Sequence, residues 1–173
     1  MAMISRMGFG QVEPNHLSAQ RNGQIYGQLP CAADIEVLEN GQFVKYDYAN
    51  GVCNFTGAGE WMLVLNEVKL YDSFWRESYK DFAMKKVNYD KGVMTPRVMK
   101  TMPGDIFTTN CIKVGNTDGK AKVDGEELEV SDILKINAQG YLAKDGTSDM
   151  EFQVVKVYTM PDGQPGVKVM RIK

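Results

Sequence analysis

The stretch VVKVYTMPDGQPGVKVMRIK (154–173) decides the fold class, because it predicts a β-hairpin. Its centre, PDG at 161–163, is turn chemistry: proline presets φ, aspartate caps the turn and glycine takes the left-handed position. Apolar residues nevertheless fall on both faces of the first strand, with Val155 and Val157 on one and Val154 on the other. A hairpin with one solvated face alternates between apolar and polar residues. The second face therefore needs a cover, either a second layer of this chain, which we favour, or a partner protein.

Similar strand-like runs recur along the chain and predict a mainly β fold of about nine strands. Asn40 with Gly41, and Asn50 with Gly51, separate the early runs; Asn-Gly is among the strongest short hairpin signals, since both residue types tolerate positive φ. The runs are QIYGQL (24–29), DIEVL (34–38), QFVKYDY (42–48), EWMLVLNEVKLY (60–71), DIFTTNCIKV (105–114), DILKI (132–136), GYLAKD (140–145) and MEFQVVKVYTM (150–160).

The segment DSFWRESYKDFAMKK (72–86) is the one helical candidate. Trp75, Tyr79 and Phe82 fall at helical spacing, but aromatic residues suit strands equally well, so an ordered non-helical excursion is the alternative. We therefore expect at most one short helix. The polar segment 116–129 reads as an exposed loop that tolerates insertion.

The expected organisation is an extended N-terminal arm (1–23), a first β lobe (24–90) and a second β lobe (91–173). Residues 87–104, which hold two prolines and two glycines, are expected to cross between the lobes. Each lobe would be a small β-barrel or sandwich. One continuous β domain over 24–173 is the alternative.

Composition restricts the function classes. Twenty lysine and arginine residues and twenty-two acidic residues give a net charge of −2, which argues against nucleic-acid binding, since such proteins usually show a basic surplus. The sequence has no apolar run long enough to span a membrane. The N-terminus lacks the continuous apolar stretch of a signal peptide, so we expect synthesis in a cytoplasm.

Residues that could carry catalysis are few. His16 is the only histidine and falls in the expected arm, so a histidine-based acid–base pair would lack a rigid platform. Cys31, Cys53 and Cys111 are widely spaced and form no Cys-x-x-Cys pair, and we expect buried thiols rather than a metal or redox site. The sequence predicts no enzyme activity, no cofactor and no metal.

The N-terminal arm carries the candidate contact residues. A solvated tail would not need so many apolar side chains close together. We expect the arm to be mobile in the isolated protein and to become ordered as a strand added to a partner's sheet. The expected contact residues are Met3, Ile4, Met7, Phe9 and Val12.

The chain as a whole resembles the capsid decoration (cement) proteins of tailed bacteriophages. The resemblance covers nearly the full length but includes no motif with a chemical mechanism. The segments that carry it are EPNHLSAQRNGQIYGQLP (13–30), VLENGQFVKYDYANG (37–51), GEWMLVLNEVKLYD (59–72), PGDIFTTNCI (103–112) and VVKVYTMPDGQPGVKVMRI (154–172).

This resemblance implies a β-rich virion structural protein that binds the outer surface of an assembled capsid and stabilises it by bridging major capsid protein subunits. Its partners would be the major capsid protein and neighbouring copies of itself, with no nucleic acid and no membrane. In lambda-like decoration proteins an N-terminal arm precedes a β-tulip body. A tail-tube or head–tail joining protein is the first alternative, and a small β-barrel module for nucleic acid or carbohydrate is the second.

Overall fold

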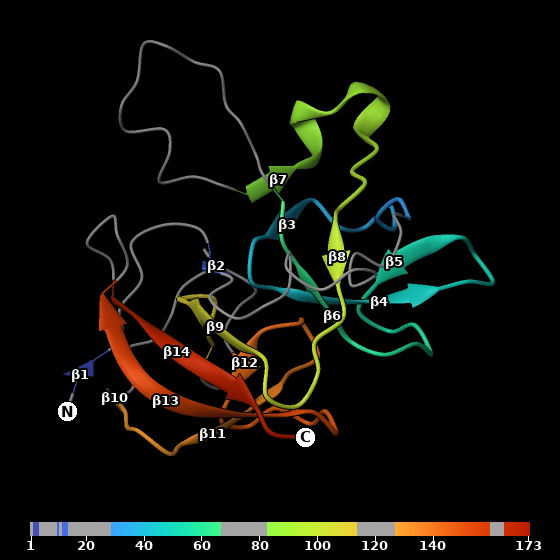
Figure 1. Cartoon of the computed structure of the whole chain (residues 1–173). Coiled ribbons are helices and arrows are strands. Elements are labelled where there is room, and N and C mark those ends of the chain that lie inside the picture. The colour runs from blue at the N-terminus through green and yellow to red at the C-terminus, as the bar shows by residue number, and fades with distance from the viewer. Residues whose placement is uncertain are drawn as a thin grey trace, which may run out of the picture.

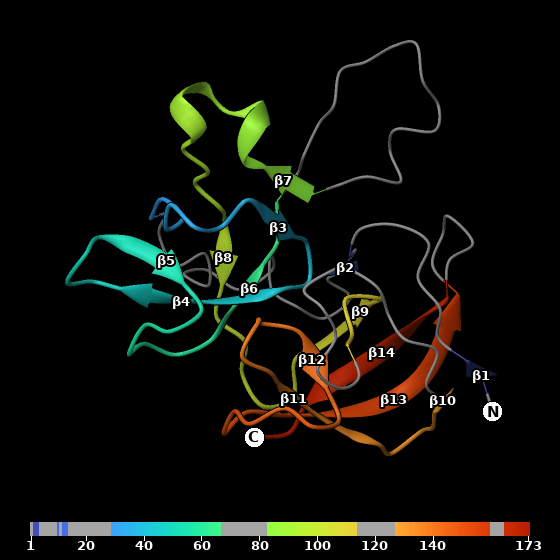
Figure 2. The same ribbon diagram turned by 180° about the vertical axis from the view of Figure 1, so that it is seen from behind.

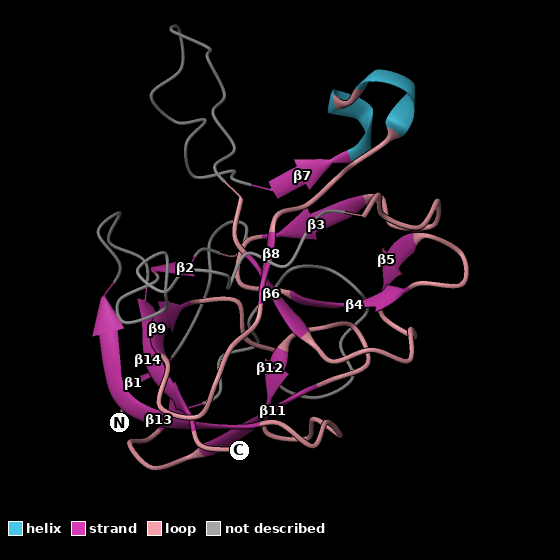
Figure 3. Ribbon diagram, turned by 45° about the vertical axis from the view of Figure 1, so that its right-hand side comes forward, coloured by secondary structure: helices cyan, strands magenta, loops and turns pink. Residues whose placement is uncertain are grey.

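The computed structural model of this chain describes residues 2–3, 10, 12–13, 29–66, 83–113, 127–159 and 165–173. This part forms fourteen β-strands and two 3₁₀ turns, and none of its residues lies in an α-helix. The 3₁₀ turns that follow β7 (Ala83–Lys85) are drawn in cyan in Figure 3. The prediction of a mainly β fold is confirmed. Gly41 and Gly51 have φ values of 89° and 66°, which confirms turns at both Asn-Gly pairs.

The largest sheet has six strands, all antiparallel to their neighbours, in the order β12-β11-β13-β14-β9-β2. It contains the closing hairpin, which lies along the lower edge of the molecule as drawn in Figure 1. Its strands are β2 (Val12–Glu13), β9 (Ile106–Thr109), β11 (Ile133–Ile136), β12 (Leu142–Ala143), β13 (Glu151–Thr159) and β14 (Pro165–Arg171).

Three further sheets complete the described part of the chain. The view from behind shows the four-stranded sheet between the hairpin β13–β14 and the pair β3–β7 (Figure 2). The four-stranded sheet has the order β5-β4-β6-β8, from β4 (Phe43–Asp47), β5 (Val52–Asn54), β6 (Met62–Val64) and β8 (Val98–Met99). The two-stranded sheets are β3 (Val37–Glu39) with β7 (Ala83–Lys85), and β1 (Ala2–Met3) with β10 (Glu127–Leu128); the 3₁₀ turns are η2 (Lys86–Asn88) and η3 (Asp90–Gly92).

The four-stranded sheet is buried on both faces and separates two hydrophobic cores. Along β6, Leu63 enters the main core, whereas Met62 and Val64 enter the second core. Phe43 and Val44 divide in the same way along β4. Strands buried on both faces read as continuous apolar runs, which explains WMLVL at 61–65.

Each core unites distant parts of the chain. The main core is Phe43, Leu63, Met99, Phe107, Ile112, Leu128, Leu134, Ile136, Leu142, Met150, Phe152, Val154, Val167 and Val169. The second core is Ile35, Leu38, Val44, Tyr46, Cys53, Met62, Val64, Met84, Met94 and Val98. Phe43 and Leu63, which the sequence assigned to the first lobe, thus pack among residues of the second half of the chain.

A β-bulge explains the two-faced pattern of the closing hairpin. Val154 pairs with Val169, and the next pair is Lys156 with Lys168, so Val155 is the extra residue. One extra residue reverses the alternation that follows it. Val154 and Val157 therefore both pack on the main core, although the sequence pattern put them on opposite faces. Next to the bulge, Val155 is half-buried and Lys156 is exposed, so the described part of the chain supplies no full covering layer there; cover by a partner protein stays a prediction. The layer covered on both faces is the four-stranded sheet.

Two segment interpretations are corrected by the structure. Ala83–Lys85, near the end of the helical candidate 72–86, forms strand β7, because Met84 pairs with Leu38 of β3 and both side chains pack in the second core. Residues 67–82 lie outside the described part. In the polar segment 116–129, Leu128 is buried in the main core and belongs to β10. Residues 114–126 lie outside the described part.

Candidate functional site

The predicted contact residues divide into two groups. Met3 lies in β1 and pairs with Glu127 of β10, and Val12 lies in β2 and pairs with Thr109 of β9. Val12 is half-buried against the main core. These strands belong to the protein's own sheets, whereas the sequence led us to expect apolar residues that await a partner. Ile4, Met7 and Phe9 lie outside the described residues.

Gly10 fixes the N-terminal segment to the body between these two strands. Its N–H donates a hydrogen bond of 2.9 Å to Oε2 of Glu39, at the end of β3. The Cys111 thiol lies 3.7 Å from the same oxygen. A Cβ at position 10 would lie 2.7 Å from Cys111 Sγ and 2.8 Å from the backbone oxygen of Asn40, so only glycine fits. We call Gly10, Glu39 and Cys111 the N-terminal latch.

The latch places a carboxylate in a dry environment. Glu39 is 1% exposed, and a buried carboxylate is costly unless hydrogen bonds compensate the lost water. Gly10 and Cys111 supply such contacts from segments far apart in the sequence. Sequence reasoning missed this cluster because Glu39, next to Asn40 and Gly41, reads as turn chemistry. The one sequence feature that could have indicated a buried carboxylate is the position of Glu39 directly after the apolar run that ends at Leu38.

The β2–β9 ladder forms the outer edge of the six-stranded sheet. β9 pairs over its whole length with β14, and on its other side, within the described residues, Thr108 and Thr109 pair with Glu13 and Val12. The next residue in the sequence is Pro14, which carries no backbone N–H to extend a ladder. This edge is therefore built for a short added strand, and its pairing involves few hydrogen bonds.

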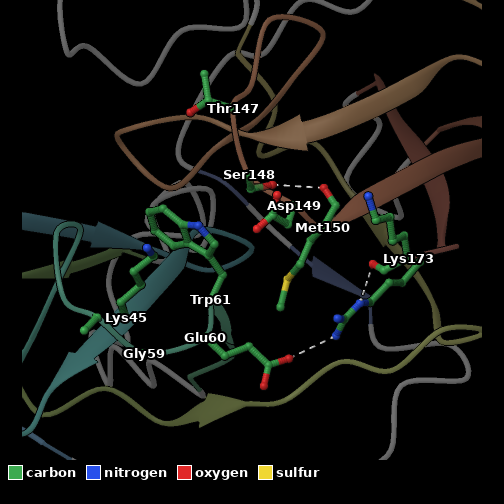
Figure 4. Close-up of a pocket in the computed structure, with 11 residues that line it drawn as sticks. Lys45, Gly59, Glu60, Trp61, Thr147, Ser148, Asp149, Met150 and Lys173 are labelled. Atoms are coloured by element: carbon green, nitrogen blue, oxygen red, sulfur yellow. Dashed lines mark hydrogen bonds and ion pairs between the residues drawn. The ribbon is translucent and has the colours of Figure 1, made fainter.

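A pocket of about 640 Å³ opens between the β5–β6 connection, the loop before β13 and the end of β14 (Figure 4). Trp61 is half-buried in it, and Lys45 Nζ lies 4.8 Å from the ring centroid. The pocket is lined by Lys45, Ala58, Gly59, Glu60, Trp61, Thr147, Ser148, Asp149, Met150, Arg171 and Lys173.

Two charged side chains of this pocket, Arg171 and Glu60, form an ion pair. Arg171 Nη1 lies 3.3 Å from Glu60 Oε1 and donates hydrogen bonds to the backbone oxygen and the hydroxyl of Thr101. Arg171 Nε donates to the backbone oxygen of Lys173 at 2.9 Å. Glu60 also faces Lys100 at 3.8 Å. Arg171 thus acts as a structural tie between β14 and the segment before β9. The pocket retains an aromatic ring and the carboxylate of Asp149 for a polar ligand.

A smaller pocket of about 310 Å³ is lined by residues that include Lys113, Tyr141, Gln42 and Gln139. Lys113 is 1% exposed, and its ammonium lies 4.2 Å from the ring centroid of Tyr141, a cation–π contact. Gln42 Nε2 donates to the backbone oxygen of Gln139 at 2.7 Å. The Lys113 contact joins the segment after β9 to the β11–β12 turn, and the Gln42 hydrogen bond joins the residue before β4 to the same turn.

Within the residues that the structure describes, no three His, Cys, Asp or Glu side chains lie close enough to hold a metal ion. His16 falls outside them. In the same part of the chain, no helix has the length and hydropathy to cross a membrane. Comparisons with family models, curated proteins and solved structures gave no match for this chain.

Proposed function

We propose that this chain is a virion structural protein that binds the outer surface of an assembled tailed-phage capsid and stabilises the shell by bridging major capsid protein subunits. It is made in the host cytoplasm, acts on the capsid surface and carries out no catalysis. Its partners are the major capsid protein and neighbouring copies of itself, without nucleic acid or membrane. The proposal includes β-barrel or β-tulip-like lobes as its finer fold assignment; the described sheets are open.

The observation that carries the proposal is the way in which the N-terminal segment joins the body. Ala2–Met3 pairs with β10 in a two-stranded sheet, and Val12–Glu13 adds a two-residue strand to the edge of the six-stranded sheet. Strand addition is a general mode of protein recognition, in which backbone hydrogen bonds give affinity and side-chain pockets set the register. The described β1–β10 ladder has two residue pairs and so involves few hydrogen bonds, which suits this pairing to exchange with a capsid strand.

The latch divides the segment into two functional parts. Gly10 and Val12 hold its second part against the main core and Glu39. We assign the capsid contact to Ile4, Met7 and Phe9, which precede the latch in the sequence and lie outside the described residues. This refines the expectation that the whole of residues 1–23 serves as the arm.

The body suits a load-bearing role. The two cores share the four-stranded sheet, which is buried on both faces. A mechanical force on this sheet is therefore opposed by close packing on each of its faces. A net charge of −2 also allows many copies to lie side by side with little mutual repulsion. A shell-binding protein uses such a repeated, modest interface in place of an active site.

Co-sedimentation with capsids that lack this chain tests the proposal. The triple variant Ile4→Ser, Met7→Ser and Phe9→Ser should lose capsid binding while its melting temperature stays unchanged. The matched variant Val12→Ser should lower the melting temperature, because Val12 packs on the main core. Wild-type binding by the triple variant, or no binding of the wild-type chain to any capsid, would contradict the proposal.

Saccharide binding at the Trp61 pocket is the second candidate function, favoured by one observation. An indole beside a carboxylate and an ammonium group offers a flat apolar surface and hydrogen-bond partners for sugar hydroxyls. Titration with soluble glycans, followed by tryptophan fluorescence, should then show saturation that Asp149→Ala weakens. A flat titration for the wild-type chain leaves the capsid proposal as the only one.

A further inference from the structure

Cys31 and Cys53 lie side by side in the register of a parallel β-bridge. Ala32 N–H donates to the Cys53 backbone oxygen at 2.9 Å, and Cys53 N–H donates to the Pro30 oxygen at 2.8 Å. Neighbouring strands lie about 4.8 Å apart, which falls within the Cα separation of about 4.4–6.8 Å that disulfides require. The two sulfur atoms share a hydrogen bond at 3.6 Å.

We propose that Cys31 and Cys53 are a site of covalent modification, at which a low-molecular-weight disulfide such as oxidised glutathione converts the two thiols into a disulfide. Neither residue is in a disulfide in this structure. A bond requires the sulfurs to approach from 3.6 Å to about 2.05 Å, a shift that side-chain rotation supplies. The backbone register is already in place, so no strand has to move.

The two thiols have different roles in this reaction. Cys31 is half-buried and can be reached by glutathione, whereas Cys53 is buried. The shared hydrogen bond lowers the pKa of Cys53 and, together with burial, raises the pKa of Cys31. In the second step Cys53, whose sulfur lies 3.6 Å from Cys31 Sγ, attacks the sulfur of Cys31.

The exchange balances in two steps. The Cys31 thiol loses its proton and attacks one sulfur of oxidised glutathione; a glutathione thiolate leaves and takes up that proton. The Cys53 thiolate then attacks Cys31 Sγ of the mixed disulfide and expels the second glutathione, which is protonated in turn. The protein loses two hydrogens and two electrons, and one oxidised glutathione becomes two reduced glutathiones.

The new bond would tie three segments together. Cys31 N–H already donates to the backbone oxygen of Met94 at 2.7 Å, and Cys53 belongs to β5 and to the second core. The cross-linked residues are 22 positions apart, and closing a loop of that size restricts the unfolded chain. We expect the melting temperature to rise by roughly 5–10 °C on oxidation.

The test uses the full-length chain incubated with oxidised glutathione, then alkylated under denaturing conditions and analysed by peptide mass spectrometry. The expected result is a Cys31–Cys53 cross-linked peptide, alkylation of Cys111 alone, and a rise in melting temperature that a reductant reverses. Cys111→Ser, the control at the remaining cysteine, should keep both effects. Cys31→Ser and Cys53→Ser should abolish them.

Three alkylated cysteines after incubation would overturn the proposal, as would glutathione retained on Cys31 as the final product. A disulfide that forms without a rise in melting temperature would overturn its stabilising role. These readings use the wild-type chain and stand even if a cysteine variant fails to fold. They also do not depend on the capsid assay, since the inference needs only two neighbouring thiols.

Discussion

Gly10 donates its backbone N–H to the carboxylate of Glu39 across 29 residues of sequence, and both residues are buried. This hydrogen bond ties the start of the chain to the end of β3 at a point where any side chain at position 10 would collide with its surroundings. Gly10, Val12 and Glu13 are thereby held on the body, which limits the part of the N-terminal segment that a partner can take up.

Gly10→Ala should destabilise the protein by about 1–3 kcal/mol, because the added methyl group would approach Cys111 Sγ and the Asn40 backbone oxygen to less than 3.0 Å. The expected fall in melting temperature is about 2–4 °C for each kcal/mol. Thermal unfolding followed by circular dichroism measures it. An unchanged melting temperature would show that position 10 is not held against the body.

The Glu39 carboxylate can be tested with a matched pair of variants. Glu39→Leu leaves the buried Gly10 N–H without its acceptor, which costs about 1–3 kcal/mol. Glu39→Gln keeps an oxygen acceptor and should lose clearly less stability. Urea unfolding gives both free energies. Equal losses for the two variants would mean that the hydrogen bond contributes nothing.

The bulge at Val155 predicts an unusual tolerance to deletion. Removing Val155 leaves Val154 and Val157 separated by Lys156 alone, so both still face the main core and the ladder with β14 becomes continuous. Removing Gln153 instead reverses Phe152 relative to Val154 and exposes core surface, at about 1.5–3 kcal/mol for each displaced side chain. We expect a folded protein from the first deletion and an unfolded or strongly destabilised one from the second. The opposite order, measured by urea unfolding, would refute the bulge assignment.

The shared sheet predicts that both cores unfold together. Leu63 and Val64 are neighbours in β6 but lie in different cores, so neither core persists without this strand. Differential scanning calorimetry should therefore show one transition, with equal calorimetric and van't Hoff enthalpies. Two resolved transitions would instead support independent lobes over 24–90 and 91–173.

The contacts of Asp132 predict that part of the protein's free energy of unfolding depends on acidic pH. Asp132 Oδ2 accepts a hydrogen bond of 2.9 Å from the Glu129 N–H and lies 3.1 Å from Lys144 Nζ. These two contacts lower the pKa of the Asp132 carboxyl from its usual 3.8. A lowered folded-state pKa stabilises the protein above pH 3.8, and this contribution disappears as the pH falls through the folded-state value. Solvent screening keeps it below about 1 kcal/mol.

Asp132→Asn isolates this component, since the amide keeps an oxygen acceptor but does not titrate. The wild-type chain should be the more stable of the two at neutral pH, and the difference should shrink at an acidic pH well below 3.8. Urea unfolding at both pH values gives the comparison. A difference that is the same at both pH values would assign the effect to packing rather than to ionisation.

Local chemistry allowed part of this fold to be predicted from the sequence. The Asn-Gly turns follow from residues that tolerate positive φ, and the apolar run WMLVL predicted a strand, which is β6. The bulge at Val155 could not be predicted, because a single extra residue leaves the same apolar pattern as a two-faced strand.

The candidate sites depended on contacts between distant segments and were mostly missed. Glu39 reads as a turn residue, and only its contacts with Gly10 and Cys111 reveal a buried carboxylate. Cys31 and Cys53 meet through a parallel bridge that no local spacing encodes. The apolar content of the N-terminal segment did draw attention to Val12, but pattern alone does not distinguish a residue that packs on its own core from one that awaits a partner.

The central claim is tested most directly by cryo-electron microscopy of purified virions from the source of this chain, reconstructed with the symmetry of the capsid. The proposal predicts density on the outer capsid surface that fits the two-core body and spans neighbouring major capsid subunits, with residues 1–9 paired to a capsid strand. Density for this chain in the tail or at the head–tail junction, or its absence from the particle, would contradict the proposal.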